Sequence, residues 1–147
     1  MKNILNDTGA IREVKEMFQS WPWGYAYHRI VLDEKGQPED YEFLHVNNAF
    51  EELTGLKREA LVGRRVTEVL PGIKDSAFNW IGFYGRIALE EGSATFEQFS
   101  EVLKKWYQVQ VFSSEKGYFS TLFVDITLEK KRAEELENFF EVNLDLL

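Results

Sequence analysis

The first pattern in the chain is an apolar stripe at helical spacing near the N-terminus. Apolar residues recur there at alternating steps of three and four, which places them on one face of an α-helix. The stripe consists of Ile11, Val14, Phe18 and Trp21. Asp7 or Thr8 can cap the start of the helix, and Pro22 ends it. The pattern therefore predicts an N-terminal flanking helix within residues 1–22.

Five later segments are rich in aromatic and β-branched residues and are bounded by turn residues, which is typical of strands. They are residues 25–32, 41–46, 96–99, 106–112 and 118–124. Turn-forming runs join the first two strands and the last two strands as hairpins. In 106–112, odd-numbered and even-numbered side chains face opposite sides of the sheet. Both sets contain large apolar groups, so we expect both faces of the sheet to be covered, at least in part.

Helical patterns lie between the two groups of strands. Asn48, followed three residues later by Glu51, has the spacing of a capping box, and Gly55 is a natural helix end. Residues 75–92 predict the longest internal helix, with one apolar face made of Ala77, Trp80, Ile81, Tyr84, Ile87 and Ala88. This order of elements predicts an α+β fold with an antiparallel sheet.

The C-terminal segment, residues 127–147, has the pattern of a charged helix. It carries a heptad seam with two polar interruptions. The seam consists of Ile126, Glu129, Ala133, Leu136, Phe140, Asn143 and Leu147. We therefore divide the chain into a flanking helix (1–22), a core (23–126) and a C-terminal linker helix (127–147).

Composition excludes several classes of function. The chain has 147 residues and a net charge of −8, which argues against binding to nucleic acids or anionic membranes. It has no cysteine, which excludes disulfides, thiolate zinc sites and iron–sulfur clusters. Two histidines argue against a multi-histidine metal site, and we expect no metal. No segment has the ~18 consecutive apolar residues of a membrane span, so we expect a cytoplasmic domain without direct membrane contact.

Three segments, in order, resemble the PAS family. The run from Val46 to Gly55 resembles the family's V-N-x-A-F-x-x-L-T-G segment, and Glu59 to Arg64 is similar to its E-x-L-x-G-R/K turn. Gly117 to Thr127 resembles the last strand of the domain, closing on Asp125-Ile126-Thr127. The resemblance covers roughly residues 18–127.

The resemblance implies a five-stranded antiparallel sheet that encloses a pocket against short helices and one longer helix on one face. It implies a non-catalytic sensory or regulatory input domain, the PAS/PAC module of a bacterial or archaeal signalling protein. The parent would be a signalling enzyme of the histidine kinase or diguanylate cyclase type, with its effector domain in the same chain. Residues 137–147 resemble the lead-in of a second PAS domain, although both ends of the chain also read as ordinary amphipathic helices.

The pocket-facing residues are expected on the long helix and on the last two strands. Tyrosine, tryptophan and threonine would supply polar tips on an otherwise apolar wall, as small-molecule pockets do. The helix face offers Trp80, Ile81 and Tyr84, and resemblance to flavin-binding members adds Tyr107, Val109, Phe119, Thr121 and Phe123. The alternative is that these side chains fill the space themselves as ordinary core.

The cofactor stays open at this point. LOV-type flavin adducts and covalent coumarate both need a cysteine and are excluded; Val66 occupies the LOV cysteine position. Non-covalent flavin binding has no positive signal. Heme is not expected, because family members typically use a histidine on the long helix, whereas His28 and His45 lie on predicted strands. The basic pairs at 64–65 and 104–105 could hold a carboxylate ligand, but they read more simply as solvated turns.

The junction after the last strand is where the family passes its signal to an output helix. Asp125 and Thr127 lie there, and they can also act simply as a helix cap. The outer sheet face and the N-terminal stripe together predict a homodimer with its flanking helices side by side, or intramolecular cover of that face by the stripe. The predicted interface consists of Ile11, Val14, Phe18, Trp21, Leu122 and Val124.

Two further functions remain as rivals. One is a ligand-free dimerisation module. The other is a small cone-shaped α+β enzyme in which Asp75 or Glu97 would act as a buried acid. The sequence shows no nucleophile–base pair and no glycine-rich phosphate loop, so an input domain that binds an unidentified small molecule or a partner is the leading hypothesis.

Overall fold

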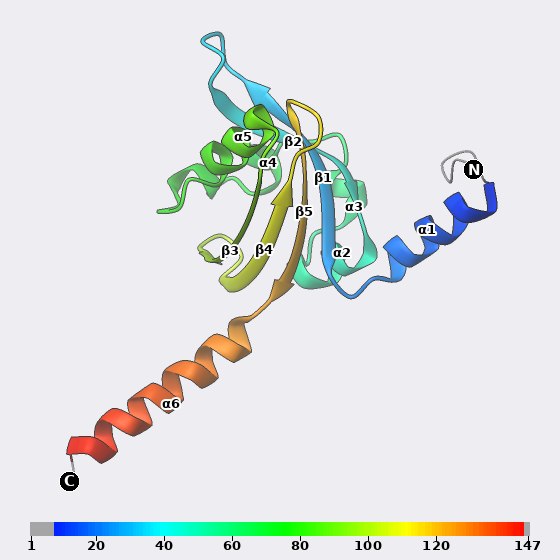
Figure 1. Ribbon diagram of the computed structural model, residues 1–147. Helices are drawn as coiled ribbons and strands as arrows, with labels where there is room; N and C mark the ends of the chain where they lie inside the picture. The colour runs from blue at the N-terminus through cyan, green and yellow to red at the C-terminus, as the bar shows by residue number, and fades with distance from the viewer. Residues whose placement is uncertain (1–7, 146–147) are drawn as a thin grey trace.

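The computed structural model describes residues 8–145, and its ribbon is shown in Figure 1. Asp7 and Leu147, named above as a cap and as the end of the heptad seam, lie outside the described residues. Twelve elements follow one another within residues 8–145. They are α1 (Thr8–Ser20), β1 (Gly24–Leu32), β2 (Pro38–Val46), α2 (Asn48–Thr54), α3 (Arg58–Leu61), α4 (Val66–Val69), the 3₁₀ helix η2 (Ile73–Asp75), α5 (Trp80–Glu90), β3 (Ser93–Ser100), β4 (Lys105–Phe112), β5 (Tyr118–Asp125) and α6 (Thr127–Asp145).

The five strands form one antiparallel sheet in the order β2-β1-β5-β4-β3. The predicted α+β fold and its antiparallel sheet are confirmed. β3 is longer than predicted, because Ser93 to Thr95 pair with β4 through backbone hydrogen bonds that need no apolar side chain. β1 and β5, the first and last strands, are neighbours in the middle of the sheet.

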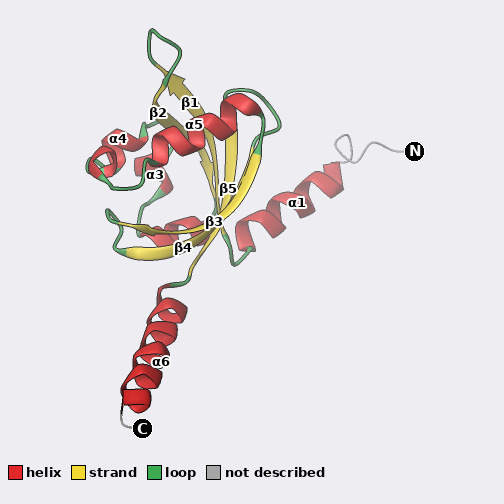
Figure 2. Ribbon diagram, turned by 60° about the vertical axis from the view of Figure 1, so that its left-hand side comes forward, coloured by secondary structure: helices red, strands yellow, loops and turns green. Residues whose placement is uncertain are grey.

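Side-chain alternation separates the two faces of the sheet, as expected from the period of two. On β4 the inner positions Tyr107, Val109 and Val111 are buried, while Phe112 on the other face is 56% exposed. Helices α2 to α5 gather on the inner face (Figure 2), and the core lies between them and the sheet.

The long internal helix starts later than predicted. Asn79 caps α5 by accepting a hydrogen bond from the Gly82 amide, so the helix begins at Trp80 and not at residue 75. Ala77 therefore precedes the helix and is exposed. The other predicted face residues are buried as expected, namely Trp80, Ile81, Tyr84, Ile87 and Ala88.

The flanking helices extend away from the core in both views. None of the residues of α1 is buried, and residues 131–144 of α6 are all exposed. Phe18, at the end of α1, packs edge-on against Tyr25 of β1 with ring centroids 4.2 Å apart. The rest of α1 leaves the sheet uncovered, so the alternative of intramolecular cover of the outer face by the stripe is wrong. Among the described helices, none is long and apolar enough to cross a membrane.

Gly85 allows α5 to lie close to the first hairpin. A Cβ atom at this position would overlap the ring of Pro38, at the start of β2, and would also meet Ile30 Cδ1 at 3.4 Å. Gly72, by contrast, has only Val102 Cγ2 within reach, at 3.8 Å.

We expect Gly85→Ala to lower the free energy of unfolding by about 1–2 kcal/mol, because overpacking costs about 1–3 kcal/mol and exceeds the helix-propensity gain. Gly72→Ala is the control and should change stability by less than about 0.5 kcal/mol. Urea unfolding of both variants checks this. Equal stability of the two variants would show that the approach of α5 to β2 is not tight.

Candidate functional site

A cavity of about 90 Å³ lies between the inner face of the sheet and the helices. Its wall is mostly apolar and aromatic. All five strands, α2, α5, η2 and the loops after α2, α4 and β3 contribute to it. The lining residues are His28, Tyr41, Phe43, Phe50, Thr54, Leu56, Leu70, Ile73, Trp80, Tyr84, Ser100, Val102, Leu103, Tyr107, Val109, Thr121 and Phe123.

Most of the predicted pocket residues lie on this wall. They are Trp80, Tyr84, Tyr107, Val109, Thr121 and Phe123. Ile81 and Phe119 are core residues that do not line the cavity. The ring of Phe119 stacks between His28 and Tyr84, with centroid distances of 4.4 and 4.9 Å, so it supports the wall from behind.

His28 is a cavity residue that sequence reasoning did not assign to the pocket. It is 3% exposed, and its Nδ1 lies 3.3 Å from the carbonyl oxygen of Phe119. A carbonyl only accepts hydrogen bonds, so Nδ1 carries the proton. Burial lowers the pKa of His28 from 6.5 to about 3. The ring is therefore neutral near pH 7, and its Nε2 is a hydrogen-bond acceptor.

Two tyrosine hydroxyls, an indole N–H and the hydroxyl of Thr121 are further polar groups of the wall without a hydrogen bond to another described residue. Tyr41, Tyr84 and Trp80 make no side-chain hydrogen bond to another residue of the described chain. Within residues 8–145, Ser76 Oγ is the one enclosed side-chain polar atom without a partner, so these groups reach accessible space. Burial raises the pKa values of Tyr41 and Tyr84, which keeps both hydroxyls protonated as donors.

None of the described residues that line the cavity is an Asp, Glu, Lys or Arg. Asp75 and Glu97, the acids of the rival enzyme hypothesis, are exposed, and Glu97 pairs with Lys130 at 3.0 Å. The carboxylate of Asp40 is buried but lies outside the wall, where it accepts hydrogen bonds from the Tyr41 amide and the Thr67 hydroxyl at 2.9 and 2.5 Å. The structure thus places neither proposed acid in the cavity.

The basic pairs also lie outside the cavity. Arg64, Arg65 and Lys104 are exposed. Lys105 donates from Nζ to the Leu53 carbonyl at 3.0 Å, and the hydroxyl of Tyr107 donates to the same oxygen at 3.3 Å. Both contacts fasten the end of α2 to β4 beside the cavity.

The C-terminal junction ties α6 to the sheet. The Asp125 carboxylate accepts a hydrogen bond from the Thr127 amide at 2.9 Å and caps α6. The hydroxyl of Thr127 accepts from the Trp106 amide at 2.9 Å, and Ile126 N–H donates to the Trp106 carbonyl at 2.8 Å. Thr127 therefore connects the first turn of α6 to β4 and does not cap its own helix.

Asn47 forms a matching junction at the N-terminal side, and the sequence analysis missed it. Its Oδ1 accepts from the amides of Phe50 and Tyr25 at 3.0 and 2.9 Å. Its Nδ2 donates to the carbonyls of Phe18 and Trp23 at 3.1 and 3.0 Å. One side chain thus joins the end of α1, the start of β1 and the start of α2. The predicted cap at Asn48 is wrong, because Asn47 caps α2.

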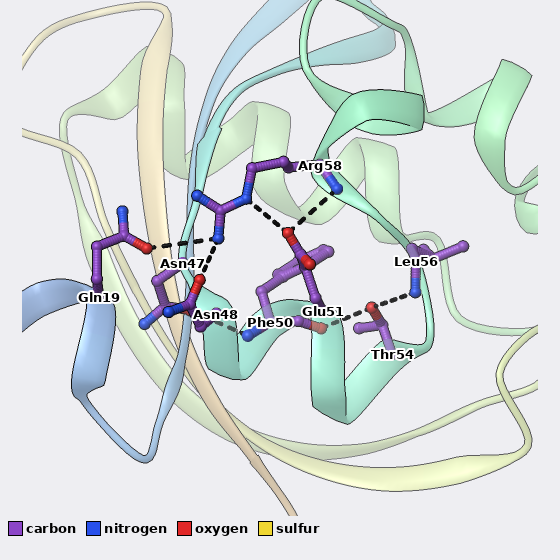
Figure 3. A network of polar contacts seen from close by, with 8 residues as sticks. All are labelled: Gln19, Asn47, Asn48, Phe50, Glu51, Thr54, Leu56 and Arg58. Atoms are coloured by element: carbon purple, nitrogen blue, oxygen red, sulfur yellow. Dashed lines mark hydrogen bonds and ion pairs between the residues drawn. The ribbon is translucent and has the colours of Figure 1, made fainter.

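Arg58 extends this junction, as Figure 3 shows. Its Nε donates to Glu51 Oε1 at 2.6 Å. Its Nη2 donates to Asn48 Oδ1 and, at 3.4 Å, to Oε1 of Gln19 on α1. The hydrogen bond from Arg58 lowers the pKa of Glu51. Glu51 therefore turns towards Arg58 and does not complete the predicted capping box. The predicted end of α2 at Gly55 is confirmed, since Gly55 has a φ of 77°.

The residues of the predicted dimer interface occupy two surfaces. Leu122 and Val124 are half-buried on the outer sheet face, and Ile11 and Phe18 are half-buried on α1. Val14 is 57% and Trp21 is 45% exposed. The homodimer itself stays a prediction.

The missed wall residues fall into three groups. His28, Tyr41 and Phe43 belong to the first hairpin, where the buried alternation of Ala26, His28 and Ile30 on β1 could have marked the inner face. The second group lies in loops and short helices without periodicity, and it comprises Leu56, Leu70, Ile73, Val102 and Leu103. The third group comprises Phe50 and Thr54 of α2 and Ser100 of β3.

Solved structures share this fold. The chain is similar over 99% of its length to an RNA-binding light-oxygen-voltage receptor (TM-score 0.65, 14% identity) and spans 41% of that receptor. It is also similar to a domain of the sensory box sensor histidine kinase/response regulator from Geobacter sulfurreducens (TM-score 0.58, 10% identity, 82% of this chain and 98% of that one). A third match is the PAS domain of a protein from Colwellia psychrerythraea (TM-score 0.54, 16% identity, 80% and 97%).

These similarities show that the chain has the PAS fold, which confirms the resemblance seen in the sequence. No protein-family model matches the chain, and no curated protein matches it either.

His28 gives the stability of the protein a pH dependence of defined sign. The unfolded imidazole titrates near 6.5 and the folded one near 3, so the unfolded state binds the proton first as the pH falls. Stability is therefore complete above the unfolded value and is lost as the pH falls towards the folded value. Between pH 7 and pH 5 we expect a loss of about 2 kcal/mol, at 1.36 kcal/mol per unit.

Urea unfolding at both pH values, for the wild type and His28→Phe, checks this expectation. The variant should lack the loss, whereas the exposed-site control His45→Phe should keep it. An equal loss in His28→Phe would assign the pH dependence to another group.

Proposed function

We propose that this chain is the sensory input domain of a multi-domain signalling protein, in which the occupancy of the cavity sets how α1 and α6 are held. A ligand can only shift such an equilibrium if it binds the two arrangements with different affinity. A cavity walled by elements that also hold the helices supports this proposal, because a change in the wall would give a ligand a different affinity for each arrangement.

One observation carries the proposal: the elements that form the cavity wall also anchor both flanking helices. β4 supplies Tyr107 and Val109 to the wall, and its Trp106 binds the first turn of α6. α2 supplies Phe50 and Thr54 to the wall and shares the Asn47 junction with the end of α1. A displacement of a wall element would therefore act directly on the contacts that hold each helix.

Both helices join the sheet at the same end. Gly24, where β1 starts, pairs with Phe123 near the end of β5, so the chain enters β1 and leaves β5 at the same end of the sheet. From there α1 and α6 run in different directions (Figure 1). A single displacement at this end of the sheet would reach both helices.

The similar proteins support the class of parent. The Geobacter sulfurreducens structure is named as part of a sensor histidine kinase, and another similar structure is named as the LOV domain of a blue-light activated histidine kinase. We propose a cytoplasmic position and an effector domain in the same chain, of the histidine kinase or diguanylate cyclase type.

The exposed apolar residues of α6 support a homodimer as part of this proposal. Leu136 and Phe140, both on the heptad seam, are 56% and 57% exposed. A second copy of the helix would cover them.

Spin-label distances test the proposal directly, and the absence of cysteine allows labels at introduced cysteines alone. One label at Glu115, in the β4–β5 loop, serves as the core reference for a second label at Glu13 on α1 or Asn138 on α6. The 19 residues of α6 span about 28 Å at 1.5 Å per residue, so a tilt of ~10° moves its far end by about 5 Å.

We expect Val109→Phe, which fills the cavity, to shift at least one of the two distance distributions by several ångströms. The matched control is Gln110→Phe, the adjacent β4 residue on the opposite face, which should leave both distributions unchanged. Unchanged distances in Val109→Phe would contradict coupling between the cavity and the helices.

Arg58→Gln tests the N-terminal route separately. It removes the ion pair with Glu51 and weakens the contact with Gln19, so the Glu115–Glu13 distribution should broaden while the Glu115–Asn138 distribution stays unchanged. The ion pair is partly exposed, with side-chain exposures of 33% and 17%, so its loss should change stability little. Equal broadening of both distributions would indicate general loosening of the fold.

A further inference from the structure

The wall chemistry defines the class of molecule that the cavity can accept. We propose that the cavity binds an uncharged molecule built on one aromatic or heteroaromatic ring, which carries both a hydrogen-bond acceptor and a donor. This inference rests on the proposed function, because it takes the cavity to be the sensory site.

Size sets the limit of one ring. The cavity of about 90 Å³ compares with about 10–15 Å³ for a single water on the same measure, so it holds roughly six to nine atom-sized positions. A six-membered ring with one small substituent needs about that number. The three fused rings of a flavin and the macrocycle of heme both exceed it.

Charge sets the second limit. A buried ion needs a charged or strongly hydrogen-bonding partner, and the wall offers no Asp, Glu, Lys or Arg side chain. The charged side chains near the cavity have hydrogen-bond partners of their own. Lys105 donates to the Leu53 carbonyl, and Asp40 accepts from the Thr67 hydroxyl. A neutral ligand carries no such penalty.

Hydrogen bonding sets the third limit. Because Nδ1 of His28 donates to the Phe119 carbonyl, its other ring nitrogen is left as an acceptor for a ligand N–H or O–H. The Tyr41 ring lies edge-on to the rings of His28 and Tyr84, with centroid distances of 5.0 and 5.8 Å. The rings that carry these groups, from β1, β2 and α5, therefore lie next to one another in the wall, and the two hydroxyls can donate to a ligand acceptor.

A further set of aromatic rings lines the cavity. Phe123 is in edge-to-face contact with Phe50 and Tyr107, at 5.4 and 5.3 Å. Such an arrangement presents both ring faces and ring edges, which favours a planar aromatic guest over a flexible aliphatic one.

Three probes of nearly the same shape test the effect of ligand charge separately from that of size. Benzamide is neutral, benzoate is an anion and benzamidinium is a cation. Each is titrated into the 147-residue chain while the tryptophan indole N–H signals are followed by NMR. Trp80 lines the cavity, whereas Trp106 lies on the outer sheet face, and a Trp80→Phe variant assigns the Trp80 signal. We expect benzamide to shift the Trp80 signal, and both ions to bind at least tenfold more weakly.

Tyr84→Phe removes a hydroxyl that has no partner among the described residues, so it should preserve the fold. We expect it to weaken benzamide binding about tenfold, which corresponds to one lost hydrogen bond of about 1.4 kcal/mol. Tyr27→Phe, on the outer face, is the matched control and should leave the affinity unchanged.

The outcomes distinguish the inference from the proposed function. If benzoate or benzamidinium shifts the Trp80 signal as strongly as benzamide, or if Tyr84→Phe binds benzamide as well as the control, the ligand class is wrong and the sensory cavity stands. If no probe shifts the Trp80 signal, the inference is overturned. The proposed function itself fails only if Val109→Phe also leaves both spin-label distances unchanged.

Discussion

The side-chain amide of Asn47 makes four hydrogen bonds from a fully buried position, and the geometry at one end of the sheet depends on them. The four bonds satisfy backbone groups at three boundaries, which are the end of α1, the entry of β1 and the start of α2. A buried amide that loses a partner leaves an unpaired polar group, which costs about 1–3 kcal/mol. The entry of β1, the cap of α2 and the end of α1 are therefore stabilised together and cannot shift independently.

The polarity of the cavity also depends on which polar groups find hydrogen-bond partners within the chain. Most polar groups near the core are satisfied within the chain, as Asp40 is by Thr67 and Thr54 is by the Phe50 carbonyl. The wall groups without a partner among the described residues come from different elements, and they include those of His28, Tyr41, Tyr84, Trp80 and Thr121. A wall that combines neutral polar tips with aromatic rings selects by shape and hydrogen bonding and not by charge.

The sheet and the α5 face were predictable because alternate positions in a strand and every third or fourth position in a helix report burial directly. Local rules failed where a partner is distant. Asn47 and Asn48 are adjacent and chemically identical, and only the fold decides which one caps α2. Glu51 has the spacing of a capping box but pairs with Arg58 instead. Leu70 and Val102 reach the cavity from loops whose sequence has no period that could reveal their direction.

The strand order places the first and last strands side by side in the middle of the sheet. Gly24 pairs with Phe123, so the central seam joins opposite ends of the core sequence. During synthesis on the ribosome, the first hairpin has no neighbour on that side until β5 has emerged. The loop closure is then entropically costly and slow. The domain consequently completes its sheet in one late step, and a chain that stops before β5 lacks the seam on which its two halves meet.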